Sequence, residues 1–328
     1  MAKKEENENY VLIIGSSNMD LNIYSQRLPK PGETVTGGRF SQFLGGKGAN
    51  QAVASIRSGA KTIFIGKIGT DPFGDQMKSR LTEEGIDMSN VIRDSEHSSG
   101  VAFIMIDENG ENMISVAPGA NFYLNKADIV KNSEIIKNAK VVVVQMEIPI
   151  ETIEEIYNIA SKGECIKILN PAPLKPIPIT ILKNIDIIIP NEGELYRLHS
   201  LLKLPEIKVE GKEKIIQASR NIADMGIDYV ITTLGSKGSM IYTRENKEVT
   251  EISAIKVNAI DTVGAGDCFN GVLASKLCNG ETIINAIRYA TAAASIAVTR
   301  KGAQDSMPFV EEIEEQYKKI QMGNNHKE

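Results

Sequence analysis

The stretch VVVVQ (141–145) contains four consecutive valines and no polar residue before its glutamine. A strand with one face in water alternates apolar and polar residues, whereas a strand covered on both faces is apolar throughout and rich in Val and Ile. The same pattern recurs in YVLIIG (10–15), TIFIG (62–66), IKILN (166–170), DIIIP (186–190) and YVITT (229–233). These runs predict the buried strands of a largely parallel sheet.

Helical patterns occupy the segments between these runs. They cover 47–58, 73–84, 126–138, 150–161 and 212–225. A strand followed by a helix, repeated along the chain, implies right-handed crossovers that place helices on both faces of one sheet. We therefore predict an α/β fold with a doubly wound, mostly parallel sheet, in a single domain spanning 10–320. The segment 266–298 departs from this rhythm and predicts two long helices that separate near Asn279.

Two further segments, about 20–44 and 98–117, carry turn residues and alternating strands instead. The second contains the hairpin signal DENG (107–110) between two alternating runs. Ligands in open α/β sheets bind beyond the carboxyl ends of the strands, so we expect the two inserts to form a small β-sheet lid over that edge. Their apolar faces also favour the pairing of two lids in a homodimer. A pair of plain surface hairpins is the alternative.

The composition restricts the class of protein. A net charge of −5 provides no basic surface for nucleic acid and no polybasic patch for a membrane. The longest apolar runs fall well short of the ~20 residues of a membrane helix, and the first residues lack the apolar core of a signal peptide. Three cysteines without metal-ligand spacing are typical of a reduced, cytoplasmic protein. The polar ends, 1–9 and 322–328, are predicted to be disordered.

The motifs of several common enzyme classes are absent. Gly46 and Lys47 are followed by glycine, where a Walker A loop requires Ser or Thr. The sequence GAG (264–266) continues with DCF, which does not complete G-x-G-x-x-G. No H-E-x-x-H or G-x-S-x-G is present either. These observations disfavour P-loop NTPases, dinucleotide oxidoreductases, zincins and α/β-hydrolases.

The stretch DTVGAGDCFNG (261–271) places two aspartates around a glycine-rich turn at the start of an apolar helix. The first N–H groups of a helix have no intrahelical partner, so uncovered glycines leave an anion-binding hole there. Asp267, in the first helical turn, would repel a phosphate. It suits a general base that takes a proton from a hydroxyl lying opposite the phosphate. The alternative is an acidic residue that only complements the helix dipole.

A second glycine-rich turn, GGKGANQAVA (45–54), also opens a helix. Its Lys47 and Asn50 offer a cationic donor and a two-way amide, which suit a hydroxyl-rich ligand. Asn18 and Asp20 follow the first strand, at the position where an α/β sheet binds its substrate. An ordinary glycine-rich loop and an ordinary loop cap are the alternatives.

Two more turns suit a nucleotide and its metal. PNEGE (190–194) follows a strand, and its Asn191 and Glu194 suit Mg²⁺ held through water. An acid-rich helix N-terminus is the alternative. TTLGSKGS (232–239) is a turn between strands that suits a nucleotide or is simply a hairpin.

This combination resembles the ribokinase-type sugar kinases, also called the PfkB carbohydrate kinase family. GGKGANQAVA and DTVGAGDCFNG match the two signatures of that family. LNPAP (169–173), PNEGE and TLGSKG (233–238) follow in the family's order, and AVTRKGAQDSMP (297–308) is similar as well. The resemblance covers nearly the whole chain, from about residue 10 to about residue 308.

The resemblance implies a role for each matching position. Asp267 would be the catalytic base for the sugar's primary hydroxyl, and the anion hole would be formed by Gly264, Ala265 and Gly266. The sugar would be held by Asn18, Asp20, Gly46, Lys47, Asn50, Glu147 and Asp267. The ATP site would include Asn191, Thr233, Gly235, Ser236, Gly238, Gly266 and Thr291, with Glu194 near Mg²⁺. A monovalent cation such as K⁺ would be held by Asp261, Val263, Ala297, Arg300, Gly302 and Ser306.

The reaction that the resemblance implies is transfer of the γ-phosphoryl group of ATP to the 5-hydroxyl of D-ribose, giving ribose 5-phosphate and ADP. The alternatives are a kinase of the same family for deoxyribose, fructose or adenosine, and a non-catalytic sugar-binding regulator. Asp267 and an intact anion hole argue against the regulator, because binding alone needs neither. Cys268 stands where a small hydroxyl residue or alanine is commoner in the family, so we expect it to react with thiol reagents with little effect on the chemistry.

Overall fold

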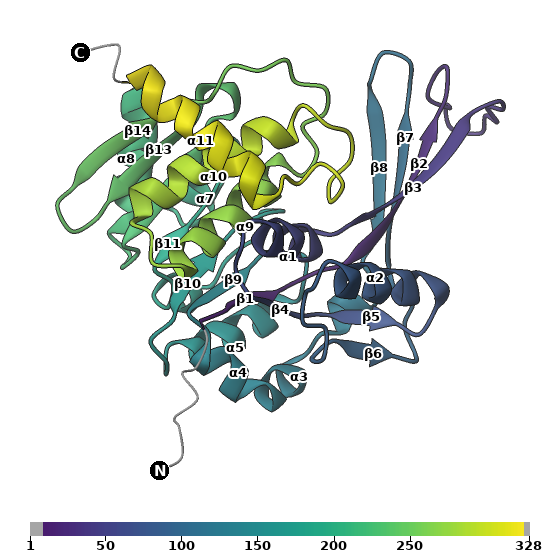
Figure 1. The fold of residues 1–328 in the computed structure, drawn as a ribbon, viewed down its shortest axis with the longest axis horizontal. Coiled ribbons are helices and arrows are strands. Elements are labelled where there is room, and N and C mark those ends of the chain that lie inside the picture. Colours follow the sequence, from purple (N-terminus) through teal and green to yellow (C-terminus); the bar gives the residue numbers. More distant parts are fainter. Residues whose placement is uncertain (1–8, 325–328) are drawn as a thin grey trace.

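The computed structural model describes residues 9–324, so the predicted disordered ends at 1–8 and 325–328 lie outside the described residues. Its centre is an eight-stranded sheet in the order β14-β13-β12-β11-β10-β9-β1-β4 (Figure 1). The strands are β1 (Val11–Ile14), β4 (Thr62–Ile65), β9 (Val141–Val144), β10 (Ile166–Leu169), β11 (Ile187–Ile188), β12 (Tyr229–Thr233), β13 (Ser239–Thr243) and β14 (Glu248–Ile252). The strands from β4 to β12 run parallel, and β13 and β14 continue the sheet antiparallel. The predicted α/β fold with a mostly parallel sheet is confirmed.

Successive residues of each strand point to opposite faces of the sheet and enter two separate apolar cores. In β1, Leu12 and Ile14 lie in one core, and Val11 and Ile13 lie in the other. The first core is covered by α3 (Lys126–Lys131), α4 (Ser133–Asn138), α5 (Ile150–Ala160), α6 (Ile179–Leu182), α7 (Glu192–Leu201) and α8 (Gly211–Ala223). The second is covered by α1 (Lys47–Arg57), α9 (Ala265–Cys278), α10 (Ile283–Ala297) and α11 (Val310–Asn324). The helices therefore cover both faces, as a doubly wound sheet requires.

Two predictions of helix boundaries are wrong. The segment 126–138 was expected to form one helix, but α3 ends at Lys131. The next residue, Asn132, caps it, and its side-chain amide donates to the carbonyl of Asp128 at 2.8 Å. Such local bonding competes with continuation of the helix. At the other end of the chain, α11 runs to Asn324, so 322–324 are helical rather than disordered. This helix is held to the protein by Ile313 and Tyr317, which are buried.

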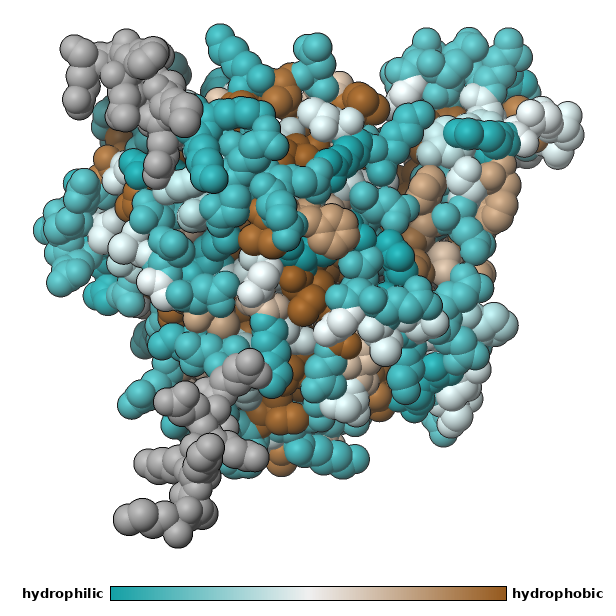
Figure 2. Space-filling view, in the orientation of Figure 1, coloured by the Kyte–Doolittle hydropathy of each residue, from teal (hydrophilic) through white to brown (hydrophobic). Residues whose placement is uncertain are grey.

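The two inserts form one four-stranded sheet that projects from the domain (Figure 1). Its strands are β2 (Asn18–Tyr24), β3 (Arg39–Gly45), β7 (Gly100–Ile106) and β8 (Asn112–Ala117), in the order β3-β2-β7-β8. The two hairpins are antiparallel, and β2 and β7 join them in parallel. We call this four-stranded sheet the lid. Figure 2 shows hydrophilic side chains over most of this face of the molecule, with apolar residues between them on the projecting sheet.

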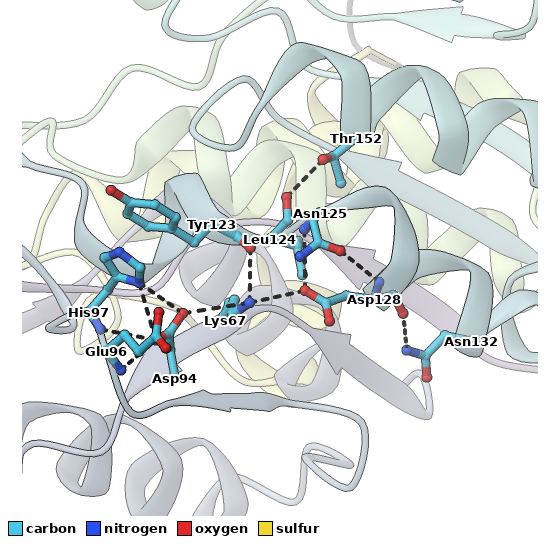
Figure 3. A network of polar contacts seen from close by, with 10 residues as sticks. All are labelled: Lys67, Asp94, Glu96, His97, Tyr123, Leu124, Asn125, Asp128, Asn132 and Thr152. Atoms are coloured by element: carbon cyan, nitrogen blue, oxygen red, sulfur yellow. Dashed lines mark hydrogen bonds and ion pairs between the residues drawn. The ribbon is translucent and has the colours of Figure 1, made fainter.

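A network of charged residues lies at the base of the β7–β8 hairpin (Figure 3). It is centred on Lys67, the first residue of the short strand β5 (Lys67–Gly69). Strand β5 pairs with β6 (Ile92–Asp94) in a two-stranded sheet, which the sequence did not predict. The Lys67 amine lies 3.5 Å from Asp94, 3.2 Å from Asp128 and 3.0 Å from the carbonyl of Tyr123. The ring of His97 stacks on Tyr123, with centroids 3.3 Å apart. The chain that enters β7 and the chain that leaves β8 are thereby joined.

Three short elements remain. Helix α2 (Pro72–Glu83) and the 3-10 helix η1 (Gly119–Tyr123) pack near the base of the lid, and the 3-10 helix η2 (Gly235–Lys237) lies in the turn between β12 and β13. Within residues 9–324, no helix is both long enough and apolar enough to cross a bilayer.

Candidate active site

Helix α9 begins directly after the glycine-rich turn that the sequence singled out. Gly264 has a left-handed φ of +75°, and a Cβ on it would stand 3.0 Å from Cα of Ala303. Only glycine fits such a position without strain. A Cβ on Gly266 would meet no atom within 4 Å, so this residue borders open space. The N–H of Ala265 donates to the carbonyl of Thr262 at 3.3 Å, and the turn leaves the N–H groups that follow it accessible to an anion, which fits the expected hole.

Asp267 lies in the first turn of α9 and is only 7% exposed. Its Oδ2 accepts a 2.9 Å hydrogen bond from the side-chain amide of Asn50, and its Oδ1 accepts a 3.0 Å bond from that of Gln51. One amide on each oxygen leaves lone pairs free on both. Oδ1 of Asn50 is buried and has no hydrogen-bond partner among the described residues. The hydroxyl of a bound sugar would satisfy this buried acceptor.

Charged groups gather around this carboxylate. The Lys47 amine has a raised pKa, mainly because of the negative charge of Asp267, with Glu147 and Glu194 adding to the effect. Burial raises the pKa of Asp20 to about 6, and the nearby charges of Glu147 and Asp267 contribute. Asp267, Glu147 and Glu194 thus act on the ammonium group of Lys47, and Asp20 is a fourth carboxylate close to the first two. This is a strongly polar setting for a hydroxyl-rich ligand.

Close backbone contacts at the glycine pair 45–46 bring this cluster together. A Cβ on Gly45 would stand 2.4 Å from Oδ2 of Asp20, so a larger residue there would push that carboxylate out of its present position. Gly46 has φ of +87°, and a Cβ on it would stand 2.7 Å from the nitrogen of Asn18. The next residue, Lys47, donates its backbone N–H to Glu147 at 3.1 Å.

Asn18 is positioned by Asn121, a buried residue of η1. The side-chain amide of Asn121 donates to Oδ1 of Asn18 at 2.8 Å, and its oxygen accepts from the N–H of Ser17 at 3.0 Å. Because the oxygen of Asn18 is occupied, its NH₂ group is the part left to face a ligand. Asn121 carried no recognisable motif, and sequence reasoning missed it.

A cavity of about 810 Å³ opens beside the cluster. Lys47 and Asp267 line it, together with the anion-hole residues Gly264, Ala265 and Gly266. All residues expected at the ATP site also line it, namely Asn191, Glu194, Thr233, Gly235, Ser236, Gly238 and Thr291. The loop 254–259, which no motif predicted, supplies a further wall, with Ala254, Ile255, Lys256, Val257 and Ala259. The volume of the cavity is in the range of small-molecule binding sites.

Asn191 and Glu194 start helix α7 as a capping box. The carboxylate of Glu194 accepts from the N–H of Asn191 at 2.9 Å, and the Asn191 oxygen accepts from the N–H of Glu194 at 2.8 Å. PNEGE therefore does form the acid-rich start of a helix. This does not exclude a role in Mg²⁺ binding, because Glu194 lines the cavity and one of its oxygens remains available there.

The residues expected around a monovalent cation lie in two loops that meet at Asp261. Its Oδ1 accepts from the N–H of Val263 and its Oδ2 from that of Gly302, both at 3.0 Å. The guanidinium of Arg300 is turned to an ion pair with Glu312, so only its backbone could serve a cation. The carbonyl of Ala297 already accepts from the N–H of Arg300 at 3.0 Å, and the hydroxyl of Ser306 donates to the carbonyl of Ala303 at 2.8 Å.

The prediction for the reactivity of Cys268 is corrected by the structure. This residue is fully buried, and burial together with the negative charge of Asp267 raises the pKa of its thiol. The thiolate is the reactive form, so the expected reaction with thiol reagents is not supported. All three cysteines are free and buried.

The sequence profile described as "pfkB family carbohydrate kinase" matches residues 8–310. The chain therefore belongs to the pfkB family of carbohydrate kinases, as its two signature motifs indicated, and it is a sugar kinase. Within this family it is 38% identical over 300 residues to the ribokinase of Haemophilus influenzae, covering 92% of this chain and 95% of that protein.

Two further similar proteins are a deoxyribokinase and a ribokinase of known structure. A deoxyribokinase of Salmonella typhi is 35% identical over 306 residues, covering 93% of this chain and 97% of that protein. The structure of Arabidopsis thaliana ribokinase complexed with ribose and ATP superposes with a TM-score of 0.88 at 32% identity, covering 95% of this chain and 99% of that one. The likeness therefore extends through the lid and the sheet alike.

Proposed function

We propose that this chain is an ATP-dependent ribokinase, which transfers the γ-phosphoryl group of ATP to the 5-hydroxyl of D-ribose and releases ribose 5-phosphate and ADP. The observation that carries the proposal is the convergence of Asp20, Asn50 and Asp267 beside the cavity of about 810 Å³. A carboxylate can accept from two neighbouring hydroxyls at once. The polar cluster suits the sugar, and the cavity suits the nucleotide.

The protein would act mainly by positioning and by stabilising charge. Asn18, Asp20, Gly46, Lys47, Asn50 and Glu147 would hold the sugar hydroxyls. Asp267 would take the proton of the 5-hydroxyl as that oxygen attacks phosphorus. The N–H groups at Gly264, Ala265 and Gly266 would stabilise the phosphoryl oxygens at the positive end of α9.

ATP needs a divalent cation, and we propose Mg²⁺, held through water near Glu194 and the phosphates. The metal would neutralise part of the phosphate charge. Asn191, Thr233, Gly235, Ser236, Gly238 and Thr291 would lie along the nucleotide. The capping box supports this assignment because it fixes the carboxylate of Glu194 at the cavity wall.

We also propose a K⁺ site at Asp261, Val263, Ala297, Arg300, Gly302 and Ser306. A cation there would neutralise Asp261 next to the anion hole. The two backbone bonds that Asp261 accepts support this proposal, because they join the loop before α9 to the loop after α10.

The lid is proposed to close over the sugar and to pair with the lid of a second copy of the chain. Several apolar side chains on it are exposed, including Phe40, Phe103 and Met113. Apolar strands of this kind favour pairing with another sheet. The domain would then span 10–320 with the two inserts as its lid. We place the enzyme in the cytoplasm, in agreement with its three free cysteines.

Deoxyribose is the second candidate substrate, because one relative at 35% identity is a deoxyribokinase. The test is kcat/KM for ribose, 2-deoxyribose, fructose and adenosine under one set of conditions. A missing hydroxyl would leave a buried acceptor unpaired at a cost of ~1–3 kcal/mol, so ribose should exceed deoxyribose roughly tenfold to hundredfold. A higher value for deoxyribose or adenosine would overturn the ribokinase assignment and leave the sugar-kinase mechanism in place.

A further inference from the structure

Behind the carboxylate of Asp267 lies a line of three buried amide side chains. Gln145, at the end of β9, donates to the oxygen of Gln51 at 2.6 Å. Gln51, in α1, donates to Oδ1 of Asp267 at 3.0 Å and lies 3.2 Å from the oxygen of Asn170. Asn170, after β10, donates in turn to the carbonyl of Ile189 at 3.0 Å. These residues have no role in the sugar or ATP sites described above, apart from Asn170, which also touches the cavity.

The hydrogen bonds along this line can run in one direction only. A glutamine side chain donates from its nitrogen and accepts at its oxygen. Since Gln145 donates to the oxygen of Gln51, the nitrogen of Gln51 must face Asp267. If the side-chain amide of Gln51 were reversed, its oxygen would face the carboxylate of Asp267 and the two would repel.

The line is closed to water. Gln51 and Gln145 are 0% exposed, and Asn170 is 7% exposed. A hydrogen bond in such a setting is stronger than one at the surface, and a lost partner costs correspondingly more. The ionisable groups that interact with Asp267 include Lys47, Asp20 and the thiol of Cys268. Lys47 also interacts with Glu147 and Glu194.

We propose that Gln51, oriented by Gln145, is a positioning residue that fixes the carboxylate of Asp267 for proton transfer. The inference rests on the proposed function, since it assigns Asp267 as the base. Gln51 holds Oδ1, and Asn50 holds Oδ2, so the plane of the carboxylate is set from two sides. Both donors are neutral amides, so they orient the carboxylate without placing a positive charge against it.

Two variants test this arrangement. Gln51→Met keeps the length of the side chain and removes the donor, while Gln145→Met leaves Gln51 free to reverse. Either change frees the carboxylate of Asp267 to rotate away from the orientation that proton transfer requires. We expect the loss to appear in kcat and not in KM for ribose, and to be smaller in Gln145→Met than in Gln51→Met. In Gln51→Met, kcat itself should fall about tenfold or more, while KM for ATP stays unchanged.

The measurement uses kcat at saturating ribose, because kcat then reports the step in the substrate complex and not the binding of the sugar. Thr152→Val is the matched control. Thr152 is fully buried and donates to the carbonyl of Leu124 at 2.7 Å, in the core on the other face of the sheet from α9. This variant should lose thermal stability without lowering kcat.

A kcat near that of the wild type in both glutamine variants, while their melting temperatures fall as in Thr152→Val, would overturn the proposal. If Gln51→Met does not fold, Gln145→Met decides. If the wild-type protein phosphorylates none of the sugars, the proposed function fails instead. The carboxyl carbon resonance of Asp267, followed by NMR of labelled aspartate, still tests the network, because Gln51→Met should shift it and Thr152→Val should not.

Discussion

The side-chain amide of Asn50 donates a 2.9 Å hydrogen bond to Oδ2 of Asp267 and so joins helices α1 and α9 across 217 residues of sequence. Gly271 permits the approach of the two helices, since a Cβ on it would stand 2.3 Å from the carbonyl oxygen of Gln51. The two glycine-rich motifs of the sequence are therefore one site in the fold.

Asp267→Asn should keep the shape of the site and remove its basicity. We expect kcat to fall by at least ~10², because a positioned general base contributes about that much. Ribose binding, followed by calorimetry, should change little. A kcat near that of the wild type would show that another group accepts the proton.

The raised pKa of Asp20 predicts how the enzyme responds to acid. With a pKa of about 6, Asp20 becomes protonated as the pH falls through that value, and the site loses an acceptor for the sugar. KM for ribose should therefore rise below pH 6. KM for ATP serves as the internal control and should rise much less.

The raised pKa of Asp20 has the opposite effect on stability: ionising this carboxyl group favours sugar binding but destabilises the fold. The pKa of Asp20 in the folded protein lies above the ordinary value of 3.8 for an aspartate, so its stabilising contribution is present at low pH and is lost as the pH rises through about 6. At pH 8 Asp20→Asn should melt at the same or a higher temperature than the wild type, while kcat/KM for ribose falls. A lower melting temperature would contradict this account.

Potassium should raise the activity severalfold over a bulky organic cation. Asp261→Ala removes the carboxylate that holds Val263 and Gly302, so its activity should be low and indifferent to the choice of cation. Equal activity of the wild-type enzyme in both salts would argue against the site. Asp305→Ala, in the same loop, changes an exposed carboxylate paired with Arg80 and is the matched control.

The lid is expected to make the dimer. Phe40 lies opposite Ile23 in the strand register, and Met113 lies opposite Met105, so these four residues share one face of the sheet. Phe103→Lys, on that same face, should shift the protein toward monomers in sedimentation equilibrium. Val130→Lys changes an equally exposed residue of α3 and should leave the mass unchanged. A wild-type monomer at micromolar concentration would refute the proposal.

The sequence predicted the elements that depend on local patterns. The runs around β1 and β9 are apolar on both faces, so their burial in a parallel sheet could be inferred without knowing the partners. The three-residue strands β5 and β6 are too short to leave a pattern, and the parallel pairing of β2 with β7 joins residues far apart in the sequence. Such pairings are set by the tertiary fold.

The same limit applies to the candidate site. Lys47, Asn50 and Asp267 stood out because they follow glycines at helix starts. Gln51 and Asn121 are amides without any such signal, and their roles depend on partners 216 and 104 residues away. Only the folded chain brings these partners within reach.

The division of the site between two sheets has a consequence for how such enzymes diversify. Asn18 and Asp20 lie on the lid strand β2, while Asp267 and the anion hole belong to helix α9 of the main domain. Substitutions on β2 can alter which sugar is admitted without disturbing the groups that handle the phosphoryl transfer. Selection can therefore change the substrate range of this scaffold by small steps, each of which leaves a working catalyst.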